Sequence, residues 1–163
     1  MNAFLLAAGK GLRLRPYTQN IPKCLIKIKK KPLLDFWLNK LEKINISKIY
    51  INTHYKSEMV QSYVRKHKSF HKIKILNEKK LLGTAGSLFK NVKQFQEDNM
   101  LMIHADNYSK FNISNLINAH NSRPKECLMT MMVFNSPNPK TCGIVEIDKN
   151  KIVRSFVEKP KKP

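Results

Sequence analysis

Residues 2–18 of the chain read NAFLLAAGKGLRLRPYT, and this stretch decides the fold. The apolar run over residues 2–8 passes directly into a glycine loop, which is typical of a buried strand. Glycines and prolines punctuate residues 9–22 and predict an irregular loop there. A glycine loop directly after a first strand lets backbone N–H groups approach phosphate oxygens closely, so this loop is a candidate phosphate site.

The rest of the chain alternates between helical and strand patterns. The expected helices cover residues 32–45, 84–95 and 112–121, with another that begins near residue 57. The expected strands cover residues 48–54, 72–78, 99–106, 127–134, 143–147 and 152–158. This alternation predicts a parallel α/β sheet with right-handed crossovers. Ligands of such sheets bind at the carboxyl ends of the strands, where Gly9, Glu78 and Asp106 fall.

The composition restricts the class of protein. A hydrophobic content of 42% over 163 residues is enough for one ordinary domain with one core. No apolar run approaches the length of a membrane span, and the N-terminus lacks the basic region and cleavage site of a signal peptide. Three cysteines without a C-x-x-C spacing indicate neither a disulfide framework nor a zinc knuckle. These features predict a cytoplasmic protein with no membrane partner.

The formal charge of +20 has two interpretations. The first is a partner rich in phosphate, and the second is lysine at ordinary solvent-facing positions. The basic residues are spread along the whole chain, and no nucleic-acid-binding module or set of interleaved aromatic residues accompanies them. We therefore expect solvent-facing lysines with a modest attraction for phosphate, and we do not expect a nucleic-acid partner.

The first glycine loop fits some phosphate-binding motifs better than others. A Walker loop is excluded because no Gly-Lys-Ser/Thr follows at the required spacing. A dinucleotide fingerprint matches weakly, since Leu14 stands at its third glycine position and the next strand ends without an acidic residue. A glycine turn with exposed basic residues is the structural alternative. Arg13 and Lys23 add charge to the loop, Arg as a bidentate fork and Lys as a mobile point charge.

The loop resembles the signature of the sugar-1-phosphate nucleotidyltransferase family, in particular that of mannose-1-phosphate guanylyltransferase-like enzymes. That signature is broadly G-x-G-x-R-L-x-P-x-T, a short spacer, P-K and then K-P-L-L. The matching residues are Gly9, Gly11, Arg13, Leu14, Pro16, Thr18, Pro22, Lys23 and residues 31–34. Leu12 departs from the family, which usually has a small hydroxyl residue there. This change removes a phosphate hydrogen bond but leaves the backbone cradle.

Later segments resemble the family as well. LGTAGS over residues 82–87 is similar to the segment that borders the nucleotide base, and a helix start capped by Thr84 is its structural alternative. HADN over residues 104–107 ends a strand in aspartate, as the family's metal-binding strand does, with alanine in place of the usual glycine. A turn-initiating aspartate is the alternative there. Two segments are similar to those near the sugar and its phosphate: CGIVE over residues 142–146 and FVEKP over residues 156–160. The structural alternative is that Glu158 and Lys159 are an exposed pair after a strand.

The resemblance implies a Rossmann-like fold, with a mixed, mostly parallel sheet flanked by helices, in one nucleotidyltransferase domain over residues 1–163. Residues 1–110 would be its nucleotide-binding part and residues 111–163 the start of its sugar-binding part. The implied activity joins a nucleoside monophosphate from a nucleoside triphosphate to a sugar 1-phosphate and releases pyrophosphate. Mg²⁺ is the implied cofactor, and neither a protein nucleophile nor a general base is required. The base and the sugar are left open.

The resemblance also implies roles for individual residues. Arg13 would neutralise the triphosphate and the leaving group, Lys23 would steady the phosphates in the transition state, and Asp106 would hold Mg²⁺. The implied nucleotide-binding residues are Ala7, Ala8, Gly9, Gly11, Glu78, Gly83 and Thr84, and the implied sugar-phosphate-binding residues are Gly143, Glu158 and Lys159.

Family members normally continue beyond the E-K-P segment, with more of the sugar pocket and a second metal-binding aspartate. We therefore expect the fold to be incomplete on its C-terminal side, and exposed apolar sheet surface is compatible with association into a homo-oligomer. Two other function classes stay open. One is a non-catalytic regulatory relative that binds nucleotide or nucleotide sugar. The other is a basic nucleic-acid-binding module, with steep salt dependence and no preference for triphosphates.

Overall fold

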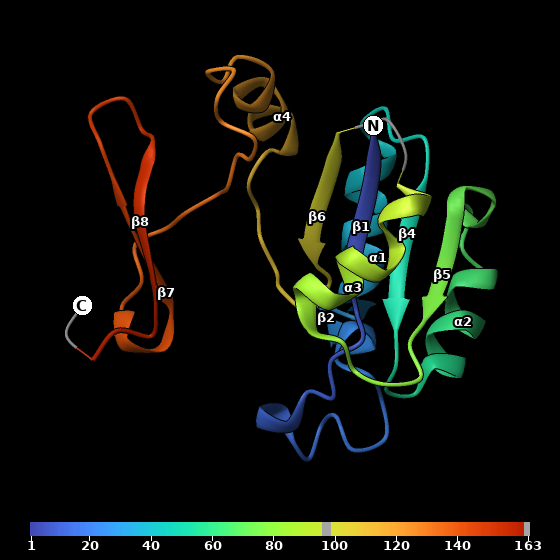
Figure 1. The fold of residues 1–163 in the computed structure, drawn as a ribbon. Helices are drawn as coiled ribbons and strands as arrows, with labels where there is room; N and C mark the ends of the chain where they lie inside the picture. The colour runs from blue at the N-terminus through green and yellow to red at the C-terminus, as the bar shows by residue number, and fades with distance from the viewer. Residues whose placement is uncertain (96–98, 162–163) are drawn as a thin grey trace. The chain divides into compact units, whose positions relative to one another are not determined.

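A four-stranded parallel sheet organises the first half of the chain (Figure 1). Its strands lie in the order β5-β4-β1-β6, and every neighbouring pair is parallel. The strands are β1 (Asn2–Leu6), β4 (Ile49–Thr53), β5 (Ile73–Asn77) and β6 (Met100–His104). All five residues of β1 and all five of β4 are buried, because these two strands occupy the middle of the sheet and are covered on both faces.

The computed structural model describes residues 1–95 and 99–161. Contacts divide the chain into two compact units, Met1–Ile113 and Ser114–Pro163. The expected α/β fold, with a mostly parallel sheet flanked by helices, is confirmed; the expected single domain over residues 1–163 stays a prediction. Within the described residues, none of the helices combines the length and the apolar character that crossing a membrane requires.

Helices connect the parallel strands and cover the sheet. They are α1 (Leu33–Glu42), α2 (Ser57–Arg65) and α3 (Gly83–Asn91). The chain moves from β1 to β4 to β5 in one direction and then returns past β1 to β6. With right-handed crossovers this reversal places α1 and α2 on one face and α3 on the other. Figure 1 shows α3 in front of the sheet and α1 behind it.

Aromatic side chains fill the core on one side of the sheet. The ring of Phe95 lies 5.2 Å from that of Phe4 and 4.9 Å from that of Tyr50, in tilted and edge-on geometries that aromatic pairs favour. Leu6 and Leu76 complete this buried cluster. The cluster joins β1, β4 and β5 to the segment that follows α3, and it thereby fixes the sheet to which the loops are attached.

Several short elements were not predicted from the sequence. They are the 3-10 turns η1 (Leu12–Leu14), η2 (Lys23–Leu25), η3 (Phe70–Lys72), η4 (Val92–Gln94) and η5 (Pro139–Thr141), and the two-residue strands β2 (Lys27–Ile28) and β3 (Lys31–Pro32). Strands β2 and β3 form an antiparallel hairpin. Lys29 and Lys30 make its turn in the left-handed region, with φ angles of 48° and 68°.

The second unit contains one hairpin. Helix α4 (Ile113–Asn121) begins at the last residue of the first unit, and β7 (Gly143–Ile147) pairs antiparallel with β8 (Val153–Glu158). The strand expected over residues 127–134 is wrong, because this apolar segment has no hydrogen-bonded partner strand in the described structure. Its side chains are accordingly exposed, Leu128 by 87% and Phe134 by 75%.

Candidate functional site

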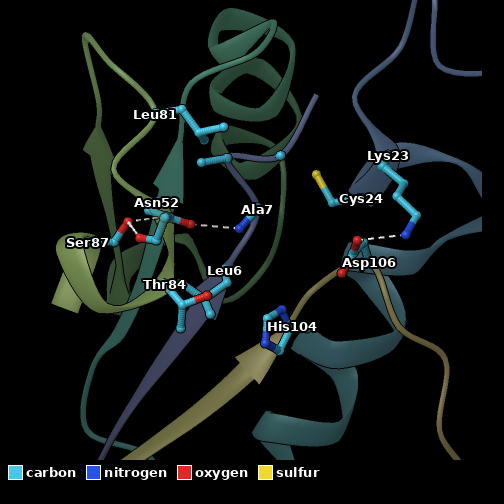
Figure 2. A pocket seen from close by; sticks show the side chains of 13 residues that line it. Leu6, Ala7, Lys23, Cys24, Asn52, Leu81, Thr84, Ser87, His104 and Asp106 are labelled. Carbon is cyan, nitrogen blue, oxygen red and sulfur yellow. Dashed lines mark hydrogen bonds and ion pairs between the residues drawn. The ribbon is translucent and has the colours of Figure 1, made fainter. Parts of the chain in front are cut away.

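A cavity of about 220 Å³ opens at the carboxyl ends of the central strands (Figure 2). The chain passes from β1 to β4 on one side of β1, and it later returns to form β6 on the other side of β1. The cavity therefore lies at the point where the strand order reverses. This is the position at which open α/β sheets bind ligands. The lining residues are Leu6, Ala7, Ala8, Gly9, Lys23, Cys24, Asn52, Leu81, Gly83, Thr84, Ser87, His104 and Asp106.

A charged pair stands at the mouth of the cavity. Lys23 Nζ lies 2.7 Å from Asp106 Oδ2, and about a third of each side chain is exposed. Lys23 comes from η2, and Asp106 follows β6, so residues 83 positions apart in the sequence meet here. Figure 2 shows the lysine side chain extended toward the carboxylate. The structure therefore brings together two residues that the sequence assigned to phosphate and to metal.

The glycine loop has a folded shape of its own. Gly11 has a φ of 64°, and a Cβ there would meet Thr18 Cγ2 at 2.9 Å and Lys23 Cβ at 3.3 Å. The hydroxyl of Thr18, itself buried, donates a 2.7 Å hydrogen bond to the Gly11 carbonyl. Glycine is required at position 11 because this close approach packs the loop against the segment that carries Lys23.

Arg13 lies apart from the cavity lining. It belongs to η1, which contains no buried residue. Gly11 likewise supports the loop and does not line the cavity. The other expected loop residues, Ala7, Ala8 and Gly9, line it directly. The roles of all five residues in binding and catalysis stay predictions.

Asn52 is a site residue that the sequence analysis missed. It is the fourth of the five residues of strand β4 and is 3% exposed. Its Oδ1 accepts a 2.7 Å hydrogen bond from the Ala7 N–H, and its Nδ2 donates to Glu78 Oε1 at 2.9 Å and to Ser87 Oγ at 3.0 Å. A buried amide with three partners fixes the first glycine loop to α3 (Figure 2). An asparagine inside an otherwise apolar strand was the available signal.

Glu78 supports the cavity from outside its lining. The carboxylate is 3% exposed, accepts the bond from Asn52 and a very short one from the Ser87 hydroxyl, and accepts a 3.3 Å bond from the Leu82 N–H. A buried carboxylate needs several donors of this kind. The direct contact with nucleotide expected of Glu78 stays a prediction, because the residue lies behind Asn52 and Ser87 and does not itself line the cavity.

The start of α3 forms another wall. Gly83 and Thr84 both line the cavity, and their contact with nucleotide stays a prediction. Gly83 is the first residue of α3 and has a φ of 72°, a conformation that favours glycine. Helix α3 is preceded by Leu82 at the N-cap position, so Thr84 is not its cap.

Cys24 adds a neutral group to the lining. It follows Lys23 and is 1% exposed, and burial raises its pKa to about 12, with Asp106 adding to the rise. The thiol is therefore protonated at neutral pH and acts as a small apolar surface rather than a nucleophile.

The expected sugar-phosphate residues lie together in the second unit. Gly143 pairs with Glu158 in the β7–β8 ladder, and Lys159 Nζ lies 3.2 Å from Glu158 Oε1. A Cβ on Gly143 would meet the Phe156 ring at 2.5 Å and Glu158 Oε2 at 3.0 Å. The glycine therefore lets an aromatic ring and a carboxylate cross over its backbone.

Comparisons with known proteins agree with this geometry. The family model described as Nucleotidyl transferase matches residues 2–163. The chain is 30% identical over 162 residues to the bifunctional protein GlmU of Methanococcus maripaludis (strain S2), covering 99% of this chain and 36% of that protein. It is also 30% identical over 176 residues to UTP–glucose-1-phosphate uridylyltransferase of Synechocystis sp., covering 98% of this chain and 44% of that protein. The chain thus spans less than half the length of these relatives.

A solved structure shares the fold. HddC from Yersinia pseudotuberculosis, crystallised with GMP-PN, superposes with a TM-score of 0.73 at 22% identity over 98% of this chain and 70% of that chain. The family resemblance that the glycine loop and the later motifs indicated is confirmed. The cavity at the strand-order reversal, the loop that carries Lys23 and the full-length match to one family lead to one conclusion: the chain belongs to the nucleotidyl transferase family.

Proposed function

We propose that the protein of which this chain forms at least a part makes a nucleotide sugar. A phosphate oxygen of a sugar 1-phosphate attacks the α-phosphorus of a nucleoside triphosphate. A new P–O bond forms there, and the bond to the β-phosphate oxygen breaks, so that pyrophosphate leaves. The observation that carries this proposal is the Lys23–Asp106 pair, which stands at a cavity built from a glycine loop and a helix start.

The cavity suits part of a nucleotide. Its volume of about 220 Å³ lies below the usual range for whole-ligand pockets, so it would take the base and ribose and leave the phosphates at its rim. Ala7, Ala8 and Gly9 on one wall and Gly83 and Thr84 on another would contact the nucleoside. Glu78 would act from behind, by holding Asn52 and Ser87 in place.

Asp106 fits a magnesium ion that arrives with the triphosphate. No cluster of three or more His, Cys, Asp or Glu side chains able to hold a metal occurs within residues 1–95 and 99–161. Magnesium is commonly bound by one or two carboxylates together with substrate phosphates and waters, so a single partly exposed carboxylate at the cavity is compatible with it. When bound, the ion would neutralise charge that develops on the phosphate oxygens.

The basic residues of the loop would neutralise the remaining negative charge of the triphosphate. Lys23 would move from Asp106 to the α-phosphate and stabilise its charge in the transition state. Arg13, exposed on η1, would reach the β- and γ-phosphates and neutralise the leaving pyrophosphate. No general base is needed, because the attacking phosphate oxygen is already ionised at neutral pH.

The sugar phosphate would be held by the second unit. Glu158 would accept hydrogen bonds from sugar hydroxyls, Lys159 would contact the sugar phosphate, and Gly143, which pairs with Glu158, would lie near the sugar. We also propose a cytoplasmic location, supported by free thiols at Cys24, Cys127 and Cys142, and self-association as a homo-oligomer, supported by the exposed apolar segment over residues 127–134.

The experiment is a screen of nucleoside triphosphates against sugar 1-phosphates with pyrophosphate release as the readout. We expect release from one combination, dependent on Mg²⁺ and lost in Asp106→Asn, whose fold should persist. Release that Asp106→Asn retains at low Mg²⁺ would remove the metal role of Asp106. Tight nucleotide binding without release for any combination would instead indicate a regulatory, nucleotide-sensing relative.

A further inference from the structure

The segment over residues 107–111, directly after Asp106, is fastened to helix α1 through its backbone. Lys40 Nζ donates to the carbonyl of Ser109 at 2.8 Å and to that of Phe111 at 2.7 Å. The segment belongs to no helix or strand, so these bonds stand in for the ladder that it lacks. The position of the chain just beyond Asp106 therefore depends in part on this side chain of α1.

A neighbouring residue on the same helix makes a third attachment. Trp37 Nε1 donates to the carbonyl of Asn107 at 2.8 Å. The ring of Tyr108 lies 4.5 Å from that of Phe36, which adds a side-chain contact between the segment and α1. Trp37 and Lys40 are three residues apart and so share a face of the helix.

The charge of Lys40 has an unusual set of partners. Its Nζ lies 5.0 Å from the centre of the Phe36 ring, 5.5 Å from that of Trp37 and 5.1 Å from that of Phe111. No carboxylate lies within salt-bridge distance of it in the described part of the chain. Burial, and then the charge of Lys43, lower its pKa. Among the described residues, carbonyl oxygens and ring faces are what compensates this ammonium group, and its two hydrogen bonds tie residues 109 and 111 to α1.

Helix α1 is also hydrogen-bonded to the segment that carries Lys23, the other residue of the charged pair. The Leu33 N–H at the start of α1 donates to the Ile26 carbonyl at 3.0 Å, and the Ile26 N–H donates to the Lys23 carbonyl at 3.1 Å. One helix thus holds the segment of Lys23 at its start and the segment after Asp106 on its face. Both residues of the 2.7 Å pair therefore stand on segments that are hydrogen-bonded to α1.

We propose that Lys40 is a positioning residue for the Asp106 carboxylate. The inference rests on the proposed metal role of Asp106. Lys40 acts through the backbone of residues 107–111 and does not touch the cavity. Groups that hydrogen-bond a metal ligand directly change metal affinity by about 10- to 100-fold when they are removed, and Lys40, which acts through the backbone, should lie at the lower end of that range.

The test uses electron paramagnetic resonance to compare the affinity of the whole chain and its variants for Mn²⁺ bound to the nucleoside triphosphate that the pyrophosphate-release screen selects, because the proposed ion arrives with that substrate. Lys40→Met keeps the apolar stem and removes the charge; we expect an affinity about tenfold weaker. Lys40→Arg keeps donors for the carbonyls and should recover most of the loss. Lys43→Met, an exposed lysine three residues on, is the control and should bind Mn²⁺ as the unmodified chain does. Trp37→Phe removes the bond to Asn107 together with part of a buried ring that faces Lys40, and it provides a second variant should Lys40→Met fail to fold.

The control separates positioning from simple electrostatics. Lys43→Met removes the same positive charge from the end of the same helix, so a loss of Mn²⁺ binding in Lys40→Met that Lys43→Met lacks reports positioning rather than charge. The only tryptophan of the chain, Trp37, gives a second readout, because loosening of residues 107–111 should shift its fluorescence without metal.

The outcomes distinguish the inference from the function on which it rests. Weaker binding in Asp106→Asn together with unchanged or tighter binding in Lys40→Met overturns the role of Lys40 and leaves the proposed function standing. Unchanged binding in Asp106→Asn overturns both the metal role of Asp106 and the positioning role of Lys40.

Discussion

Three glycines around the cavity should respond to alanine in a definite order. At Gly9 a Cβ would meet no atom within 4 Å, and its φ lies outside the left-handed region. Gly83 has equally open surroundings but a φ of 72°. Gly11 combines a φ of 64° with a Cβ contact of 2.9 Å to Thr18. The series therefore separates the effect of backbone strain from that of steric collision.

The magnitudes follow from these differences. Gly9→Ala should be neutral or stabilise by up to about 1 kcal/mol, since it restricts the unfolded chain. Gly83→Ala should lower the free energy of unfolding by about 1–2 kcal/mol, the penalty of a left-handed conformation. Gly11→Ala adds about 1–3 kcal/mol for the displaced Thr18 and Lys23 side chains, for a total of about 2–5 kcal/mol.

Urea unfolding followed by circular dichroism measures all three variants. A total of about 2–5 kcal/mol is a large part of the roughly 5–15 kcal/mol available to a domain, so Gly11→Ala should shift the midpoint clearly. Nucleotide binding gives the complementary result, because Gly9→Ala should weaken binding while its stability stays intact. Equal destabilisation by Gly11→Ala and Gly83→Ala would show that the contact with Thr18 is not restrictive, and the account of the loop would be wrong.

Three further predictions concern single side chains. Arg13→Ala should lower pyrophosphate release about 10²- to 10³-fold, the scale of one lost electrostatic donor, and should leave the melting temperature unchanged because η1 is exposed; normal kinetics would remove Arg13 from the mechanism. Asn52→Leu should lower the free energy of unfolding by about 1–3 kcal/mol or more in chemical denaturation, because the buried Glu78 and Ser87 lose a donor, whereas Asn115→Leu at an exposed position of α4 should cost much less. The pKa of Cys24 rises from 9.0 to about 12 on folding, so its contribution to stability is full below pH 9 and decreases by roughly 1.4 kcal/mol per pH unit up to pH 12. The free energy of unfolding should therefore decrease less steeply between pH 8 and 11 in Cys24→Ala than in the unmodified chain. Parallel pH curves for the two proteins would contradict this assignment.

Local patterns in the sequence predicted the sheet and much of the cavity. The run over residues 2–8 becomes β1, and the glycines after it line the cavity or fold the loop, because burial and glycine geometry are properties of short segments. Asp106 was predictable for the same reason, as a charge at the end of an apolar strand.

Contacts between residues that are far apart in the sequence could not be predicted from local patterns. Asn52 was counted as one more strand residue, and its link to Ala7, 45 positions away, exists only once β1 and β4 pair. Lys40 belonged to an ordinary amphipathic helix until the segment over residues 107–111 was placed against it. Residues 127–134 show the converse error, since a strand pattern cannot supply the partner strand that a ladder needs.

The strand order of the parallel sheet also bears on how the chain folds as it is synthesised. Strand β1 precedes both of its neighbours, and Leu5 pairs with Ile51 on one side and with Ile103 on the other. After β1 has been synthesised, the ribosome must therefore add about a hundred residues before β6 can cover the second edge of β1. Such non-local pairing slows folding. Until then NAFLL is an apolar segment with an open edge, of the kind that chaperones bind and that aggregates when none is present.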